Sequence, residues 1–172
     1  INQTLHLFGD GMGVSILKNL SATGAGVRFA GGYCGIHDMT IDQNGSTGIG
    51  YRHGGQHSNS SNLIVKNQTG TDYAVIVDGT TLVELDSIKV QECAYGIGVA
   101  TTTPTQYVRF YNCSVGFTVG KAIYVGTCTD IVFDNCYIET GNTLGNISES
   151  VLVDGGINII FNDFTAEFSG TH

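Results

Sequence analysis

The sequence predicts an all-β protein, a right-handed parallel β-helix of about seven coils, and three observations support this fold class. No stretch of eleven or more residues places apolar side chains at the spacing of a helix. Short alternating segments that resemble one another recur instead, at intervals of 23 to 28 residues. The composition also suits strands and turns, with 25 glycines, a single proline and many Thr, Ser and Asn residues.

A first alternating segment recurs six times, and its fifth position breaks the alternation between two apolar pairs. The chain must bend at that position for both pairs to face inward. Asn and Asp tolerate the left-handed backbone that such a bend requires. Stacking the copies predicts inward ladders of like residues, such as Leu85, Phe110 and Phe133. The predicted bends are Asp38, Asn62, Ser87, Asn112, Asn135 and Asp163.

A second, three-residue alternating segment lies between the first ones. Each unit is too short for a βαβ crossover helix, so its strands are expected to pair with those of the next unit. An immunoglobulin-like sandwich would need hairpin turns every 8–12 residues. Hexapeptide and calcium-binding nonapeptide solenoids would need tighter repeats, so both alternatives fit less well. The predicted copies of the second segment are 27–29, 49–51, 75–77, 97–99, 123–125 and 151–153.

Composition excludes several classes of partner. The 172 residues carry a net charge of −8, and only 13% are charged, which disfavours nucleic acid and anionic membranes. No apolar run approaches the ~20 residues that cross a bilayer. Five cysteines form neither CxxC pairs nor a Cys/His pattern, so we expect free thiols, no metal and no cofactor. The chain is expected to be one domain, residues 1–172, cut from a longer protein.

Two coil motifs resemble those of the pectate-lyase-like parallel β-helix superfamily, and within it those of bacteriophage tailspikes. They are Leu5-His-Leu-Phe-Gly-Asp-Gly11 and Ile36-His-Asp-Met-Thr-Ile-Asp42. The resemblance implies a homotrimer on the virion tail, outside the host cell. It also implies binding, and often cleavage, of a host polysaccharide such as capsule or lipopolysaccharide O-antigen. The polygalacturonase and alginate-epimerase signatures of the superfamily are missing from this sequence.

Outward positions on successive coils suggest where polysaccharide chemistry would take place. Glycoside cleavage needs two carboxyl groups flanking the bond. Asp86 and Asp134 are predicted two coils apart, and Glu139 lies on the coil of Asp134. The acid and the base are expected among these three residues. The alternative is a row of solvated side chains, with Glu84 and Arg109 as a cross-strand ion pair. Expected substrate-binding residues are Glu84, Arg109, Tyr111 and Tyr137.

The segment Arg52-His-Gly-Gly-Gln-His57 is predicted to be a polar loop. Its two histidines, His53 and His57, are candidate substrate-binding residues, and the alternative is a plain loop. The intervening glycines indicate a turn rather than a helical metal motif. Asp78 and Asp154 are expected to be solvated on the second sheet, three coils apart.

Three functions remain open from the sequence. The favoured hypothesis is a tailspike segment that recognises a host polysaccharide. Whether it also depolymerises the polysaccharide, by hydrolysis or by elimination, is left open by the sequence. The alternatives are a secreted bacterial polysaccharide lyase or glycoside hydrolase and a non-catalytic adhesive β-helix. The fold does not decide among them, because function resides in the site.

Overall fold

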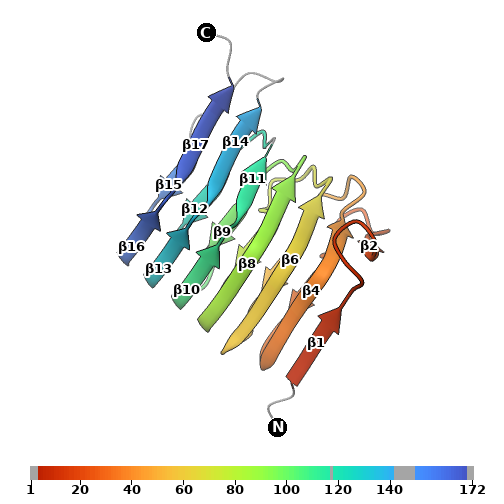
Figure 1. Ribbon diagram of the computed structural model, residues 1–172, viewed down its shortest axis with the longest axis horizontal. Coiled ribbons are helices and arrows are strands. Elements are labelled where there is room, and N and C mark those ends of the chain that lie inside the picture. The colour runs from red at the N-terminus through yellow and green to blue at the C-terminus, as the bar shows by residue number, and fades with distance from the viewer. Residues whose placement is uncertain (1–3, 117, 142–149, 170–172) are drawn as a thin grey trace.

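The computed structural model describes residues 4–116, 118–141 and 150–169, and in them the chain forms a parallel β-solenoid of about six turns. The described residues contain no helix, and therefore none that could span a membrane. The predicted β-helix is confirmed, with one turn fewer than the seven expected. Strands stack in chain order along the solenoid axis, from β1 at one end to β16 and β17 at the other (Figure 1).

Each turn contributes to three faces. The strands of the first face, some of which continue beyond a bend, are β1 (Thr4–Phe8), β4 (Tyr33–Asp42), β6 (Ser58–Lys66), β8 (Thr81–Gln91), β10 (Thr105–Tyr111), β13 (Cys128–Asp134) and β16 (Ile157–Asn162). The second face, after the bend, adds β2 (Ile16–Lys18), β11 (Ser114–Gly116), β14 (Tyr137–Gly141) and β17 (Thr165–Ser169). The third face is a separate six-stranded sheet of β3 (Val27–Phe29), β5 (Tyr51–His53), β7 (Val75–Val77), β9 (Ile97–Val99), β12 (Ile123–Val125) and β15 (Val151–Val153).

The predicted bends between the first two faces are confirmed at all six positions. Each has a positive φ, between 44° at Asp163 and 57° at Asp38. Side-chain amides link several of them along the axis, because residues at equivalent positions are one strand spacing apart. Asn62 Nδ2 donates to Asp38 Oδ1 at 2.8 Å, and Asn135 Nδ2 donates to Asn112 Oδ1 at 2.7 Å. The bend therefore repeats at one place in every turn and separates the two faces.

The core consists of the ladders that the sequence predicts. Leu85, Phe110, Phe133 and Phe161 occupy one register position on four successive strands. The rings of Phe110 and Phe133 stack at 4.6 Å, and those of Phe133 and Phe161 at 5.0 Å. All five cysteines are buried free thiols, which confirms the prediction. Stacked like residues thus fill the interior from one turn to the next.

The register predicted for the third face is wrong in one turn. Strand β5 is Tyr51–His53 rather than 49–51, with Tyr51 opposite Val27 and Val75. A slip of two residues leaves the same parity facing inward, so alternation does not distinguish the two registers. As a consequence, His53 is in a core position between Phe29 and Val77, not in a loop.

The conformation of the bend can be tested at Asn135, which has φ 51° and is exposed. Asn135→Ala should lower the free energy of unfolding by about 1–3 kcal/mol, because Ala disfavours the left-handed region and loses the bond to Asn112. Asn135→Gly loses the same bond but accepts the backbone, so it should cost less. Urea unfolding of both variants measures the difference. Equal losses would show that the backbone conformation contributes nothing.

Candidate functional site

The outward side chains of the first face form three parallel lines along the solenoid axis. We call the line at the start of the strands the rim ladder, and the next two the Glu84 row and the Asp86 row. Strand register places their members side by side. The rim ladder is His57, Leu82, Tyr107, Asp130 and Asn158, the Glu84 row is Asn59, Glu84, Arg109, Val132 and Ile160, and the Asp86 row is His37, Ser61, Asp86, Tyr111 and Asp134.

A groove of about 800 Å³ runs between the rim ladder and the Glu84 row. Every member of both lines contributes to it, so the groove crosses five consecutive strands. A smaller hollow of about 390 Å³ lies next to it and contains Ser61, Asp86 and Tyr111. Asn59 and Glu84 line both cavities. The two cavities therefore meet at these residues on one face.

The rim ladder has an unusual backbone, and the sequence analysis missed it. All five members have positive φ, between 50° at His57 and 60° at Asn158. Asn and Asp accept this conformation, whereas Leu82 at 58° and Tyr107 at 53° are bulky residues held in a strained region. Both side chains are 47% exposed. The detectable signal is a second break in the alternation near the start of each first-face strand, masked by the variety of residue types at that position.

Six of the nine predicted site residues lie together on the first face. Asp86 is beside Tyr111 and Tyr111 is beside Asp134, as predicted, so the two carboxylates are two strands apart, or roughly 9–10 Å by strand spacing. Asp86 Oδ1 accepts hydrogen bonds from Asn112 Nδ2 at 2.9 Å and Ser87 Oγ at 3.2 Å. The others on this face are Glu84, Arg109 and His57.

Glu84 and Arg109 are register neighbours but do not form the ion pair of the alternative interpretation, since within the described residues no charged atoms of this pair approach to ion-pairing distance. Arg109 Nη1 instead donates to the hydroxyl of Tyr111 at 3.4 Å, a long contact. The Glu84 carboxylate and the Arg109 guanidinium are both exposed. Each is therefore available to a ligand in the groove.

Glu139 and Tyr137 do not join this group, because the Asn135 bend turns them onto the second face. Tyr137 donates from its hydroxyl to Glu167 Oε2 at 2.8 Å, and this carboxylate partner raises the pKa of Tyr137 to about 12. Glu139 is opposite Glu167 in the register of β14 and β17. These residues form a separate surface cluster on the second face.

His53 is a correction to the predicted substrate-binding set. Its side chain has no exposed surface, so it cannot contact a substrate in this structure. His53 Nε2 is 2.7 Å from Ser58 Oγ, and Nδ1 is bonded to the Tyr51 hydroxyl. Tyr51 also bonds Ser60 Oγ at 2.7 Å. The network satisfies polar groups that would otherwise be unpaired in the core, and burial lowers the pKa of His53 to about 4.

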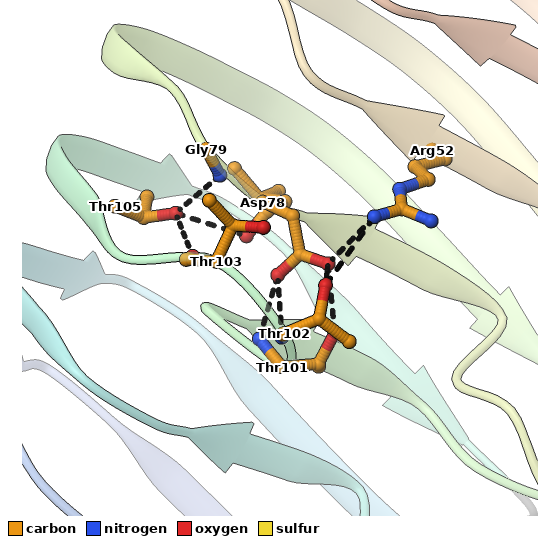
Figure 2. A network of polar contacts seen from close by, with 8 residues as sticks. Arg52, Asp78, Gly79, Thr101, Thr102, Thr103 and Thr105 are labelled. Atoms are coloured by element: carbon orange, nitrogen blue, oxygen red, sulfur yellow. Dashed lines mark hydrogen bonds and ion pairs between the residues drawn. The ribbon is translucent and has the colours of Figure 1, made fainter.

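Asp78 is a second correction, because it is buried and not solvated. Its carboxylate accepts from the backbone nitrogens of Thr101 and Thr102 at 2.6 and 3.3 Å and from their hydroxyls at 2.9 and 3.0 Å. Arg52 Nη2 completes the set at 3.1 Å. Figure 2 shows these donors converging on the carboxylate from β5 and from the loop after β9. Asp78 thus holds a threonine-rich loop against the third face.

No group of three or more His, Cys, Asp or Glu residues in the described part of the chain could hold a metal ion.

No protein-family model matches the chain, and no curated protein matches it. Among solved structures, a proposed glycosyl hydrolase from Parabacteroides merdae is similar at 15% identity and a TM-score of 0.44, covering 84% of this chain and 81% of that one. The A-module of a mannuronan C-5 epimerase from Azotobacter vinelandii is similar at 12% identity and a TM-score of 0.31, covering 96% and 81%. At these values neither protein informs the function of this chain.

The role of Asp78 can be tested against a matched aspartate on the same sheet. Asp78→Asn should lower the free energy of unfolding by about 2–4 kcal/mol, because the buried charge-assisted bonds are lost. The exposed Asp154→Asn should change it by less than about 0.5 kcal/mol. Urea unfolding measures both variants, and equal effects would contradict the assignment.

The buried His53 makes stability depend on pH. Its folded pKa of about 4 lies below the reference 6.5, so the unfolded state takes up a proton first as the pH falls. The free energy of unfolding should fall by about 3 kcal/mol between pH 6.5 and pH 4 because of this residue. Below pH 4 His53 should cause no further loss. His53→Gln should flatten this part of the stability curve, with the exposed His57→Gln as control. Parallel curves for wild type and His53→Gln would disprove the effect.

Proposed function

We propose that the first face binds a polysaccharide chain lying along the solenoid axis and that carboxylates of the same face cleave it. The observation that carries this proposal is the groove of about 800 Å³, which crosses five consecutive strands. Five strands span about 19 Å. A groove of this length suits an extended polymer better than a compact small molecule.

The chemistry of the lining supports a saccharide ligand. Asn59, Glu84 and Arg109 offer amide, carboxylate and guanidinium groups, which match hydroxyls and acidic substituents. Tyr107 provides an exposed ring on the rim for stacking against a sugar face. The strained backbone of Leu82 and Tyr107 also favours a binding role, since such strain concentrates at functional sites.

Cleavage would use Asp86 as one of two carboxylates. Asp134 is its partner across Tyr111, at a separation close to the 6.5–9.5 Å typical of inverting glycosidases. Glu84 is the second possible partner, two residues earlier on the same strand and roughly 7 Å away. In either pairing, one carboxyl protonates the leaving oxygen and the other activates water.

The wider context of this proposal is a bacteriophage tailspike. In such a tailspike the chain would be part of a homotrimer on the virion tail, and its ligand would be a host capsule or lipopolysaccharide O-antigen. The coil motifs at Leu5–Gly11 and Ile36–Asp42 support this context by resemblance. Analytical ultracentrifugation of the protein tests the trimer.

The catalytic assignment predicts a graded set of variants. Asp86→Asn should reduce polysaccharide cleavage by about 10²–10⁴-fold, because it removes a general acid or base. Asp134→Asn and Glu84→Gln identify the partner, since only the true partner should cause a loss of similar size. Reducing ends, together with the ultraviolet absorbance of unsaturated products, measure the reaction and separate hydrolysis from elimination.

Asp154→Asn is the control, because it makes the same change on the third face. Calorimetric titration with a panel of bacterial polysaccharides measures binding independently of cleavage. Unchanged cleavage by Asp86→Asn would remove this residue from the mechanism. Binding without cleavage by the wild-type protein would leave an adhesive module, and no binding of any polysaccharide tested would overturn the proposal.

A further inference from the structure

A chain of three hydrogen-bonded side chains runs across the first face beside the small hollow. Ser61 Oγ is 2.9 Å from His37 Nδ1, and His37 Nε2 is 2.9 Å from His6 Nδ1. The three residues come from successive strands β6, β4 and β1. Ser61 lines the small hollow together with Asp86 and Tyr111. Ser61 therefore faces a cavity and is hydrogen-bonded to His37, which is in turn hydrogen-bonded to His6.

The packing around His37 fixes its ring. The residue is only 7% exposed, although it points away from the core. The ring of Phe8 stacks on it at 4.7 Å, and the ring of His6 lies nearly parallel at 5.2 Å. A histidine held in this way keeps Nδ1 directed at Ser61, which is the positioning that a general base requires.

The hydrogen bonds allow one continuous direction of donation. With the His37 proton on Nε2, that N–H donates to His6 Nδ1, and His37 Nδ1 accepts from the Ser61 hydroxyl. This is the tautomer in which a base can take the serine proton. A nucleophile, a base and a group that orients the base form the arrangement that activates serine on unrelated folds.

We propose that Ser61 is the nucleophile and His37 the general base of an ester-hydrolysing site. Ser61 Oγ attacks the acyl carbon while its proton moves to His37 Nδ1. The carbon–oxygen bond to the alcohol then breaks, and His37 returns the proton to the departing alkoxide. Water then gives a proton to His37 and attacks the acyl carbon; the bond from that carbon to Ser61 Oγ breaks, and His37 returns the proton to Ser61 Oγ, which leaves a carboxylic acid and the free serine.

The small hollow has further groups that suit this reaction. Asn59 and Tyr111 line it with an amide and a phenol, both donors for the negative oxygen that develops on the acyl group. Asp86 would compete with His37 if its carboxylate accepted the hydrogen bond of the Ser61 hydroxyl. Its carboxylate is instead bonded by Asn112 and Ser87, and no hydrogen bond joins it to Ser61 in the described structure.

A second serine–histidine pair shows what distinguishes this one. Ser58 Oγ and His53 Nε2 are slightly closer, at 2.7 Å, but both side chains point into the solenoid, and His53 has no exposed surface. That pair satisfies core polar groups: Ser58 borders the groove, but its histidine is enclosed in the core and is also bonded to Tyr51. The pair of Ser61 and His37 has the same chemistry on the outward side, next to a cavity.

The natural substrate class follows from position and rests on the proposed function. The small hollow meets the saccharide groove at Asn59 and Glu84. A sugar bound there would present its substituents to Ser61. The ester is therefore an O-acyl group, such as acetyl, carried by the polysaccharide. The serine–histidine pair itself needs no saccharide, so a small ester tests it separately.

The first test uses p-nitrophenyl acetate and a fluorophosphonate label. Wild-type protein should hydrolyse the ester, and mass spectrometry should find the phosphonyl group on Ser61. Ser61→Ala and His37→Gln should each lose at least about 100-fold in kcat/KM. Ser114→Ala, an outward serine on the second face, is the matched control and should retain wild-type activity. Circular dichroism confirms that each variant is folded.

The second test identifies His6 as a positioning residue. Burial and the neighbouring His6 lower the pKa of His37, whereas Asp38 on the same strand raises it. On the other side of His37, strand β6 places the uncharged Ser61 next to it, and the carboxylate of Asp86 lies one strand further away. Activity needs neutral His37, so it should rise with pH around a midpoint below 6.5. His6→Ala removes one lowering influence and should move that midpoint upward. A purely structural role for His6 would lower the rate without moving the midpoint.

The outcomes separate this site from the proposed function. Equal ester hydrolysis by wild type and Ser61→Ala, or no labelling of Ser61, would overturn the esterase. Labelling of Ser61 with loss of hydrolysis in both variants would support it, whether or not any polysaccharide binds. Release of acetate from an acetylated polysaccharide that the protein binds, lost in Ser61→Ala, would confirm the substrate class. Binding of that polysaccharide without release of acetate would overturn it.

Discussion

Every other feature of this molecule depends on the parallel backbone pairing of each turn with the next. The pairing keeps equivalent residues about 4.8 Å apart along the axis. Any residue type that recurs in the sequence therefore becomes a continuous line in space. The stacked rings of Phe110, Phe133 and Phe161 are such a line in the core, and the amide ladder of Asn112 and Asn135 is another at the bend.

The same pairing determines where chemistry can accumulate. Outward residues are not packed against another layer of the protein. Their types can therefore differ from turn to turn while the core ladders remain alike. Glu84, Arg109 and Tyr107 differ from one another and line the same groove. The left-handed backbone at Leu82 and Tyr107 is maintained because the ladder on both sides holds it there. A regular scaffold thus supports an irregular, strained surface.

Buried polar groups impose a different requirement, because each needs hydrogen-bond partners. His53 and Asp78 are enclosed, and each is stable only because hydrogen-bond partners reach it: Tyr51 and Ser58 for His53, and a loop of the next turn for Asp78. Ser61 and His37 show the same bonding on the outer surface, where a cavity adjoins it. Position relative to the sheet, rather than residue type, separates the structural pair from the proposed catalytic pair.

The sequence by itself determined the repeat, the inward ladders and the bend at positions such as Asn112, because these depend on local alternation and on backbone preference. It did not determine the register of β5, since alternation alone does not distinguish two registers that differ by two residues. The observed register places His53 in the core. It also missed the rim ladder and the bonds of Asp78. Those features join residues 23 to 28 positions apart, and only the stacked turns decide which of them meet.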